Sequence, residues 1–335
     1  MTHHWIDGLE IGKEGVLSLA QRALDLRSGT KPKRFDGARI AAVFMNPSLR
    51  TKMSMDFAAS TLGAHMVSLE PGTTSWGWEY RKGVTMNEDK AEHLIDAVGV
   101  LSEMADILAV RSFASLTNKE YDAQDITLST FVQHSSQPVI NLESTLYHPL
   151  QGLADTATWL DHLGTDLSKK SITLTWAPHP KALPTAVANQ VLLSAAIQGM
   201  DITLAHPEEF SLPPFVLEKS KSIAEKQGGS FRQTNDQSSA LSGANVVVAK
   251  SWSGWQGYGK REEEAVAREK HKDWIIDSEK MALTKRAGFM HCLPVRRNVV
   301  VCDAVIDGPN SWTKKTAGLR MWTAIALLES MLGAL

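Results

Sequence analysis

Short apolar runs alternate with helix-like stretches along almost the whole chain, and this alternation limits the fold more than any other feature of the sequence. Each run has the length of a buried strand, and the runs occupy residues 38–45, 65–69, 106–113, 138–143, 171–177, 201–206, 244–249 and 288–293. Helices are predicted for residues 51–63, 89–104, 149–164, 184–200 and 313–335. Strands that alternate with helices in this way form parallel sheets with helices on both faces.

The length of 335 residues predicts two such sheets, since a single hydrophobic core stops growing near about 250–300 residues. We expect an α/β protein made of two doubly wound parallel-sheet domains joined by interdomain helices. Residues 1–147 would form the first domain and residues 148–310 the second, and the C-terminal helix within residues 311–335 would return to the first. Residues 228–243 and 251–272 are polar and are predicted to be loops.

Composition and charge exclude several classes of protein. Lys and Arg (35) nearly balance Asp and Glu (37), a net charge of −2, so we expect no nucleic-acid partner. Two cysteines, Cys292 and Cys302, are too few for a disulfide framework or a four-thiolate zinc site. No run of about 18 apolar residues occurs, so we expect no membrane span. The first residues lack the pattern of a secretory signal, so the expected location is cytoplasmic.

Ligands of such sheets bind beyond the carboxyl ends of the strands. The segment after the first long strand, Asn46-Pro47-Ser48-Leu49-Arg50-Thr51-Lys52, leads into a predicted helix. Hydroxyl groups, free N–H groups at a helix start and a guanidinium together favour a phosphate group. The segment lacks the glycines of a dinucleotide-binding or Walker loop, which argues against NAD and ATP. It therefore predicts a phosphate site.

Ser48-Leu49-Arg50-Thr51 resembles the carbamoyl-phosphate loop of the aspartate/ornithine carbamoyltransferase family, in which an arginine follows where this chain has Lys52. The resemblance continues in chain order with Arg111, with His148-Pro149-Leu150-Gln151 and with Arg320 on the last helix. It implies that carbamoyl phosphate is bound by Ser48, Leu49, Arg50, Thr51, Trp76, Arg111, His148, Gln151 and Arg320. The catalytic residues that it implies are Thr51, Arg111 and His148, which would act on the carbonyl oxygen.

Toward the C-terminus, His291-Cys292-Leu293-Pro294 resembles the corresponding segment of ornithine carbamoyltransferases. The resemblance implies that Cys292 and the carbonyl of Leu293 lie beside the attacking amine. A cysteine can act as a covalent nucleophile. An amine attacks an activated carbonyl without such an intermediate, however, so we expect Cys292 to be a packed side chain.

One departure from ornithine carbamoyltransferases concerns the charge that faces the acceptor. This chain has Lys250-Ser251-Trp252 where those enzymes carry an Asp and a Ser-Met-Gly sequence that bind free ornithine. An acylated α-nitrogen carries no cation, and a buried Asp facing it would be unpaired and costly. The pattern resembles the N-acyl-ornithine carbamoyltransferases. This subfamily implies acceptor contacts from Glu143, His179, Lys250, Cys292, Leu293 and Arg296.

Trp76 and Ala91 bear on the subunit arrangement and on the acyl group. Trp76 matches a loop that the subfamily inserts into the neighbouring subunit's site, which implies a homotrimer with shared sites. Ala91 stands where N-acetylornithine enzymes carry Glu and N-succinylornithine enzymes carry Pro, and Val300 replaces a late Lys of the acetyl enzymes. Because Glu would repel a succinyl carboxylate and Ala would not, we expect N-succinyl-L-ornithine as acceptor, with N-acetyl-L-ornithine as the alternative. The cation for the succinyl carboxylate stays open between Lys90 and Lys181.

The resemblance implies that the carbamoyl group passes from carbamoyl phosphate to the δ-nitrogen of the acyl-ornithine, a step of arginine biosynthesis. Orientation and charge stabilisation would supply the rate, with no protein nucleophile, no metal and no cofactor. A nicotinamide dehydrogenase would suit the fold, but no Gly-x-Gly-x-x-Gly follows a predicted strand. A non-catalytic homologue would have lost some of five residues that are all present: Arg50, Thr51, Arg111, His148 and Gln151.

Overall fold

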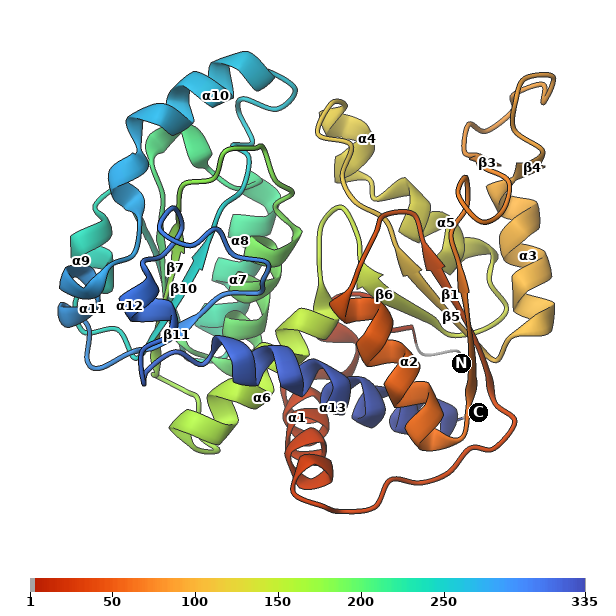
Figure 1. The fold of residues 1–335 in the computed structure, drawn as a ribbon, viewed down its shortest axis with the longest axis horizontal. Coiled ribbons are helices and arrows are strands. Elements are labelled where there is room, and N and C mark those ends of the chain that lie inside the picture. Colours follow the sequence, from red (N-terminus) through yellow and green to blue (C-terminus); the bar gives the residue numbers. More distant parts are fainter. Residues whose placement is uncertain (1–3, 335) are drawn as a thin grey trace.

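The computed structural model describes residues 4–334, and two separate parallel sheets form its framework (Figure 1). The four strands of the first sheet lie in the order β2-β1-β5-β6. Their bounds are β1 Arg39–Phe44, β2 His65–Leu69, β5 Ile107–Arg111 and β6 Val139–Glu143. Every neighbouring pair is parallel, and Ile40 of β1 lies opposite Met66 on one side and Ile107 on the other. The strands predicted at these positions are therefore confirmed.

The second sheet has five parallel strands in the order β11-β10-β7-β8-β9. Their bounds are β7 Ser171–Trp176, β8 Asp201–Ala205, β9 Ser230–Thr234, β10 Val246–Lys250 and β11 Gly288–Met290. The valines of β10 are all buried, as expected for a strand that is covered on both faces. A small separate sheet pairs β3 Trp78–Glu79 with β4 Glu92–His93.

Helices cover both faces of the first sheet. Val43 and Val110 pack in one cluster with side chains of α3 Leu94–Met104 and α5 Ile126–His134. Ala42 and Ala109, which point to the other face, pack in a second cluster that extends into the rest of the molecule. The remaining helices are α1 Gly12–Arg27, α2 Arg50–Leu62, α4 Lys119–Ala123, α6 Pro149–Leu163, α7 Ala186–Gln198, α8 Pro214–Lys226, α9 Gln237–Leu241, α10 Arg261–Lys270, α11 Ser278–Ala282, α12 Asp303–Ile306 and α13 Thr313–Leu332. None of the helices in this described part is both long and apolar enough to cross a bilayer.

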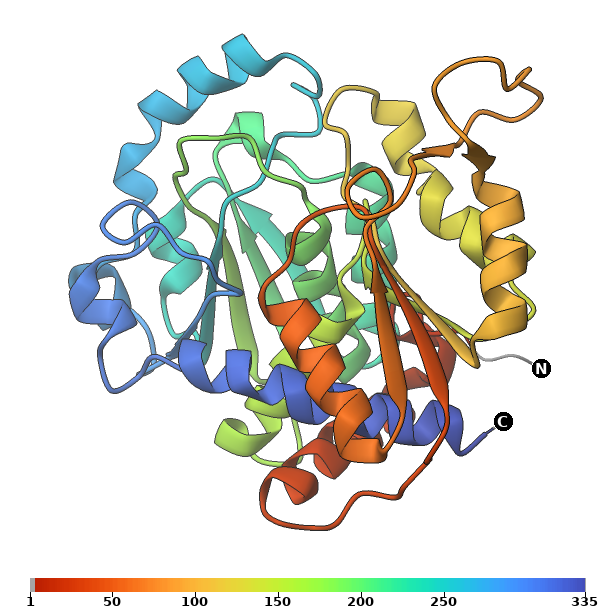
Figure 2. The same cartoon turned by 45° about the vertical axis from the view of Figure 1, so that its right-hand side comes forward.

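Helices α6 and α13 connect the two sheets, and α13 runs from the side of the second sheet toward α1 and α2 (Figures 1 and 2). The hydroxyl of Thr158 on α6 donates a hydrogen bond to Thr316 Oγ1 on α13 over 3.0 Å. Near the end of α13, Glu329 forms an ion pair with Arg22 of α1 at 2.7 Å. The last helix therefore returns to the first sheet, as the sequence predicted.

Two helices begin later than predicted. The helix expected for residues 89–104 starts only at Leu94, because the two residues before it form β4 and the His93 ring accepts a hydrogen bond from the Ile95 N–H. The helix expected for residues 184–200 starts at Ala186, so Pro184 is not its first residue. In the segment before it, the Leu183 carbonyl accepts a hydrogen bond from the Ser253 N–H.

Two segments predicted to be loops contain regular structure. Residues 228–243 hold β9 and α9, and the Asp236 carboxylate caps α9 by accepting a hydrogen bond from the Ser239 N–H. Strand β9 is an edge strand with largely polar, exposed side chains, so its sequence lacks the apolar signal of the other strands. Residues 251–272 hold α10, whose charged sequence resembles a solvated loop.

Each sheet has a point where the chain reverses the side on which it adds strands. The chain places β2 on one side of β1 and then β5 on the other, and it places β8 on one side of β7 and then β10 on the other. Such reversals open a crevice at the carboxyl ends of the strands concerned. Arg111 ends β5 and Lys250 ends β10, so both predicted site residues lie at a reversal.

Candidate active site

A cavity of about 860 Å³ is lined by residues that follow the strands of both sheets and by residues of α2, α6 and α13. Most predicted site residues line it: Ser48, Leu49, Arg50, Thr51, Arg111, Glu143, His148, Gln151, His179, Lys250, Cys292, Leu293 and Arg320. Lys52 lines it as well and pairs with Glu70. Trp76, Ala91 and Arg296 are absent from this lining. Side chains far apart in the sequence therefore meet in one place.

The loop between β1 and α2 is held in place from both ends. Asn46 Oδ1 accepts a hydrogen bond of 2.7 Å from the N–H of Phe113, which follows β5. At the other end, the Thr51 N–H donates to Ser48 Oγ over 3.3 Å. The amino end of α2 thus faces the cavity with free N–H groups and the positive end of the helix dipole, which favours an anion.

Two arginines converge on the hydroxyl of Thr51. Arg320 Nη2 lies 2.7 Å from Thr51 Oγ1, and Arg111 Nη1 lies 3.4 Å from the same oxygen. Arg111 also pairs with Glu143 Oε2 at 2.5 Å. Burial lowers the pKa of Arg320 to about 10, which leaves it protonated at neutral pH. Both guanidinium groups are therefore buried and fixed in direction.

Positive charge exceeds negative charge in this half of the cavity. Two carboxylates, those of Glu70 and Glu143, line the cavity with three arginines. Glu70 is already paired with Lys52, so only the carboxylate of Glu143 remains to balance the arginines Arg50, Arg111 and Arg320. The Nε atoms of all three arginines are buried and have no hydrogen-bond partner among residues 4–334. Buried donors without partners are costly unless a ligand satisfies them. The arrangement suits an anion that carries several acceptor oxygens.

His148 lies in the same half and is uncharged. Its Nε2 atom is 3.4 Å from Glu143 Oε2, and its Nδ1 atom is buried without a partner in the described part of the chain. Burial, followed by the charges of Arg320, Arg111 and Arg50, holds the pKa of His148 well below its ordinary value. A neutral imidazole presents one N–H donor, which can polarise a carbonyl oxygen without bringing in a further charge.

The opposite half of the cavity carries Lys250 and His179. The Lys250 ammonium donates to the backbone carbonyl of Ser251 over 2.9 Å, and Lys250 is itself buried. His179 lies in the segment between β7 and α7, where its Nδ1 atom accepts a hydrogen bond of 3.0 Å from the Lys181 N–H. This half therefore offers one buried cation and a histidine ring, which come from the strand ends of the second sheet.

Cys292, Leu293 and Pro294 also line the cavity. Burial raises the pKa of the Cys292 thiol, so it is a neutral thiol rather than a nucleophilic thiolate at neutral pH. The His291 ring, whose pKa burial lowers to about 3, accepts the Leu293 N–H at 2.9 Å. Leu293 has a φ of 55°, a conformation that non-glycine residues adopt at a cost and that clusters at functional sites. These contacts direct the backbone at Leu293 toward the cavity, whose lining includes that residue.

Residues 76–93 contain β3 and β4 and form a projection, the β3–β4 projection, at the outer edge of the molecule (Figure 1). Trp76 and Ala91 both belong to this segment. The Trp76 side chain is 61% exposed, and its Nε1 donates to Glu92 Oε2 over 2.7 Å. Trp78 donates to the same oxygen over 3.2 Å and is buried. Within one chain, neither Trp76 nor Ala91 lines the cavity. Arg296 is exposed and likewise stays outside the lining.

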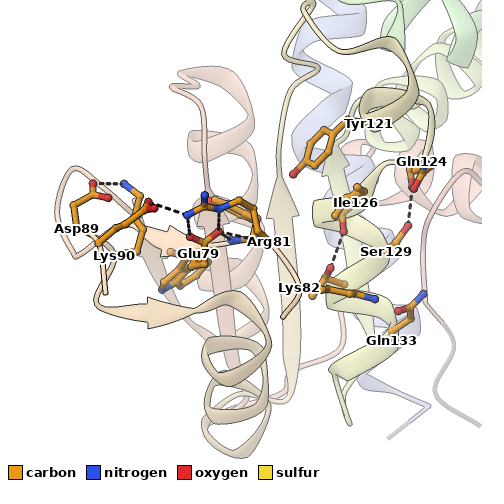
Figure 3. Close-up of a pocket in the computed structure, with 14 residues that line it drawn as sticks. Glu79, Arg81, Lys82, Asp89, Lys90, Tyr121, Gln124, Ile126, Ser129 and Gln133 are labelled. Carbon is orange, nitrogen blue, oxygen red and sulfur yellow. Dashed lines mark hydrogen bonds and ion pairs between the residues drawn. The ribbon is translucent and has the colours of Figure 1, made fainter. Parts of the chain in front are cut away.

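A second cavity, of about 850 Å³, lies beside this projection against α5 (Figure 3). Its charged side chains other than Lys82 pair with one another: Arg81 contacts Glu79 at 2.7 Å and Glu88 at 2.9 Å, and Lys90 contacts Asp89 at 3.0 Å. The hydrogen bond from Arg81 lowers the pKa of Glu79 to about 2. This cavity matches the first in volume but lacks its unpaired buried donors, so we place the candidate site in the first.

Some features of the site were not predicted from the sequence. Phe113 packs its ring 4.4 Å from the Arg111 guanidinium, and Asp155 accepts a hydrogen bond from Gln151. Phe113 ends a predicted strand, a place where site residues are expected, whereas Asp155 lies inside a predicted helix and has no such signal. Within residues 4–334, no group of three His, Cys, Asp or Glu side chains is arranged to hold a metal ion.

Comparison with known proteins gives matches along nearly the whole chain. The carbamoyl-P binding domain of aspartate/ornithine carbamoyltransferase matches residues 3–161, and the Asp/Orn binding domain of the same family matches residues 183–331. The N-acetylornithine carbamoyltransferase of Xanthomonas campestris pv. campestris is 37% identical over 98% of each chain. That of Xylella fastidiosa (strain Temecula1) is 40% identical over 88% of each chain. The N-succinylornithine carbamoyltransferase of Bacteroides fragilis is 36% identical over 87% of this chain and 86% of its own.

Solved structures agree with the sequence matches. Acetylornithine transcarbamylase complexed with acetylcitrulline has a TM-score of 0.95 and 36% identity, and the match covers 98% of each chain. A variant of N-acetyl-L-ornithine transcarbamylase with one glutamate replaced by alanine, complexed with carbamyl phosphate and N-succinyl-L-norvaline, has the same TM-score and identity. With both family domains matched in order, the chain belongs to the aspartate/ornithine carbamoyltransferase family.

Proposed function

We propose that the protein transfers the carbamoyl group of carbamoyl phosphate to the δ-amine of an N-acyl-L-ornithine, in the biosynthesis of arginine. The observation that carries this proposal is the charge pattern of the cavity. Arg111 and Arg320 lie buried at the amino end of α2, and Lys250 lies in the opposite half where free-ornithine enzymes would need a carboxylate. The names of the most similar relatives support the same reaction.

In this proposal the phosphate group binds at the start of α2. The backbone N–H groups of Leu49 and of the start of α2, together with the side chains of Ser48, Arg50 and Thr51, would hold it. The carbonyl oxygen would then point toward Thr51, Arg111 and His148. Gln151 and the Leu293 carbonyl would receive the amino group of the carbamoyl moiety and the incoming amine.

The chemical step adds the δ-nitrogen to the carbonyl carbon and gives a tetrahedral intermediate with negative charge on the carbonyl oxygen. Collapse of the intermediate breaks the bond from carbon to the phosphate oxygen. The amine loses one proton, which the departing phosphate accepts. Each donor that faces the carbonyl oxygen is worth about 2.7–4 kcal/mol in reactions of this kind. The neutral state of His148 fits the role of a donor.

The acceptor would bind on the side of the second sheet. Lys250 would pair with its α-carboxylate, and His179, Glu143, Cys292 and Arg296 would contact the rest of the molecule. We assign carbamoyl-phosphate binding to residues 1–147 with the C-terminal helix 311–335, and acceptor binding to residues 148–310. Glu143, which pairs with Arg111, would link the two functions.

For the acyl group, N-acetyl-L-ornithine is the first candidate, ahead of the succinyl acceptor that the sequence favoured. Relatives named for the acetyl acceptor are 37–40% identical to this chain, and those named for the succinyl acceptor are 35–36% identical. Ala91 is the specific observation that keeps N-succinyl-L-ornithine as the second candidate. A transcarbamylase with a glutamate replaced by alanine has been solved with N-succinyl-L-norvaline, and Ala91 stands where the acetyl enzymes carry a glutamate.

The exposed Trp76 supports a shared site. An indole that is 61% exposed on a projecting segment is unusual for an isolated chain. We propose a homotrimer in which Trp76 and Ala91 of each subunit complete the cavity of a neighbour.

Incubation with carbamoyl phosphate and each acceptor tests the proposal. We expect the ureido product to form with an N-acyl-L-ornithine and to be at least about tenfold slower with free ornithine, whose ammonium would meet Lys250. Faster turnover of free ornithine would contradict the N-acyl assignment. The ratio of rates with the acetyl and succinyl acceptors decides the acyl group.

A further inference from the structure

We propose that Asp155 is a positioning residue that fixes the side-chain amide of Gln151, so that the amide oxygen faces the amino group of the bound carbamoyl moiety. This inference rests on the proposed function, because it concerns how the same cavity distinguishes one part of carbamoyl phosphate. Asp155 does not line the cavity and would act only through Gln151.

The two side chains lie on successive turns of α6 and are both buried. Gln151 Nε2 donates to Asp155 Oδ1 over 2.9 Å. The other end of the amide, Gln151 Oε1, is buried and has no hydrogen-bond partner in the part of the chain that the structure describes. Since Gln151 lines the cavity, its free oxygen is the end that a ligand can reach.

The direction of this amide matters because its two ends have opposite chemistry. A carboxylate only accepts hydrogen bonds, so an ionised Asp155 selects the NH2 end of Gln151 and leaves the oxygen toward the ligand. Carbamoyl phosphate has one donor group, its NH2, and all its other polar atoms are acceptors. The arginines and Thr51 match those acceptors, whereas Gln151 Oε1 is a side-chain acceptor suited to the NH2 group. If the amide were reversed, the NH2 group of Gln151 would face the NH2 group of carbamoyl phosphate, and neither could accept a hydrogen bond from the other.

The burial of Asp155 opposes the ionised state that this role needs, which sets the pH of the test. Burial raises the pKa of Asp155 to about 7, while its hydrogen bond from Gln151 and the charge of Arg320 oppose the increase. At pH 8 the carboxylate therefore predominates, and binding is best measured there.

Two non-hydrolysable ligands isolate the contribution of the NH2 group. Phosphonoacetamide carries the NH2, and phosphonoacetone has a methyl group in its place, with the same carbonyl and phosphonate groups. Calorimetric titration of the full-length protein at pH 8 gives a dissociation constant for each. We expect the protein to bind the amide about 10- to 100-fold more tightly, because the methyl compound leaves Gln151 Oε1 unsatisfied. Gln151→Met should abolish this preference and serves as the reference.

Variants of Asp155 then separate positioning from structural support. Asp155→Leu and the smaller Asp155→Val cannot accept a hydrogen bond, so they should reduce the preference to less than about threefold and leave phosphonoacetone affinity within about twofold. Asp155→Asn still offers an acceptor and should retain most of the preference. Asp161→Asn makes the same change at an exposed carboxylate of α6 and should retain all of it.

The possible results are distinguishable. An unchanged preference in the Leu and Val variants would overturn the role of Asp155, and so would an equal loss of affinity for both ligands, which indicates general damage. Failure of the unmodified protein to bind either phosphonate would instead contradict the proposed function.

Discussion

The two halves of the cavity differ in how their polar groups are held before a ligand binds. On the side of the first sheet, Arg111 ends a strand and Arg320 lies within a long helix, and both are fixed on Thr51 Oγ1. On the side of the second sheet, the Lys250 ammonium donates to the carbonyl of the next residue, and His179 lies in the segment between β7 and α7. The first half is organised by long-range contacts and the second by local ones.

This difference matches the two tasks of the proposed reaction. Groups that stabilise charge in a transition state act best when they need no rearrangement, which favours side chains on packed helices and strands. Groups that select an acceptor can lie on segments after strands, where sequence changes leave the framework intact. Substitutions in the first half should therefore affect the chemical step, and those in the second half should affect acceptor binding.

Arg111→Met should have the largest effect on this comparison. Loss of a donor to the carbonyl oxygen should lower kcat/KM for carbamoyl phosphate by about 10²- to 10³-fold, measured from initial rates of ureido product. Arg39→Met makes the same change at the amino end of β1, where Arg39 pairs with Asp106, and should change the rate by less than about twofold. If kcat/KM of Arg111→Met falls by less than tenfold, this half of the cavity does not stabilise the transition state as proposed.

Lys250→Met should have the next largest effect, confined to the acceptor. Without the ammonium group, the acceptor carboxylate loses a charge-assisted hydrogen bond, and KM for the N-acyl-ornithine should rise by about 10- to 100-fold. The affinity for phosphonoacetamide, measured by calorimetry, should stay within about twofold. Lys170→Met, which lies just before β7 at the opposite end of the sheet, is the control. Equal weakening of both ligands would show that the two halves are not separable.

Ala91→Glu tests whether the β3–β4 projection of one subunit reaches the acceptor half of another. A glutamate beside a succinyl carboxylate should shift the ratio of kcat/KM toward N-acetyl-L-ornithine by at least about fivefold, corresponding to about 1 kcal/mol of repulsion. Ala91→Gln adds the same bulk without the charge and should shift the ratio much less. If both variants leave the ratio unchanged, the projection does not set the acyl preference.

Cys292→Ala should have the smallest effect on rate. A thiol with a raised pKa is a poor nucleophile, so its removal should lower kcat by less than about tenfold through lost packing. Removal of a true nucleophile costs on the order of 10⁶-fold in kcat. The measurement is a steady-state rate at saturating substrates, and a loss of that size would restore covalent catalysis as an alternative.

The apolar strands and the loop that leads from β1 into α2 could be predicted from the sequence because their signals are local. Strand β2 was predicted with its observed bounds, and the segment from Ser48 to Thr51 follows the expected strand. Strand β9 was missed because an edge strand needs few apolar residues, and the start of α3 was placed early because pairing with β3 determines it. Local patterns therefore predict elements better than their boundaries.

The sequence indicated most of the residues that line the cavity, but not the contacts among them. The ion pair between Arg111 and Glu143 and the hydrogen bond between Gln151 and Asp155 depend on how strands and helices pack, which no short motif records. For Trp76 and Ala91, the resemblance to known motifs implies a place in the site, but in a single chain neither residue lines the cavity. Their role requires a second copy of the chain.

The most direct test of the account is a crystal structure of the protein with phosphonoacetamide. The account predicts phosphonate oxygens within hydrogen-bonding distance of the N–H groups at the start of α2 and of Arg50, with the carbonyl oxygen directed at Arg111 and His148. Phosphonate bound elsewhere, for example in the second cavity beside Arg81, with the amino end of α2 unoccupied, would contradict it.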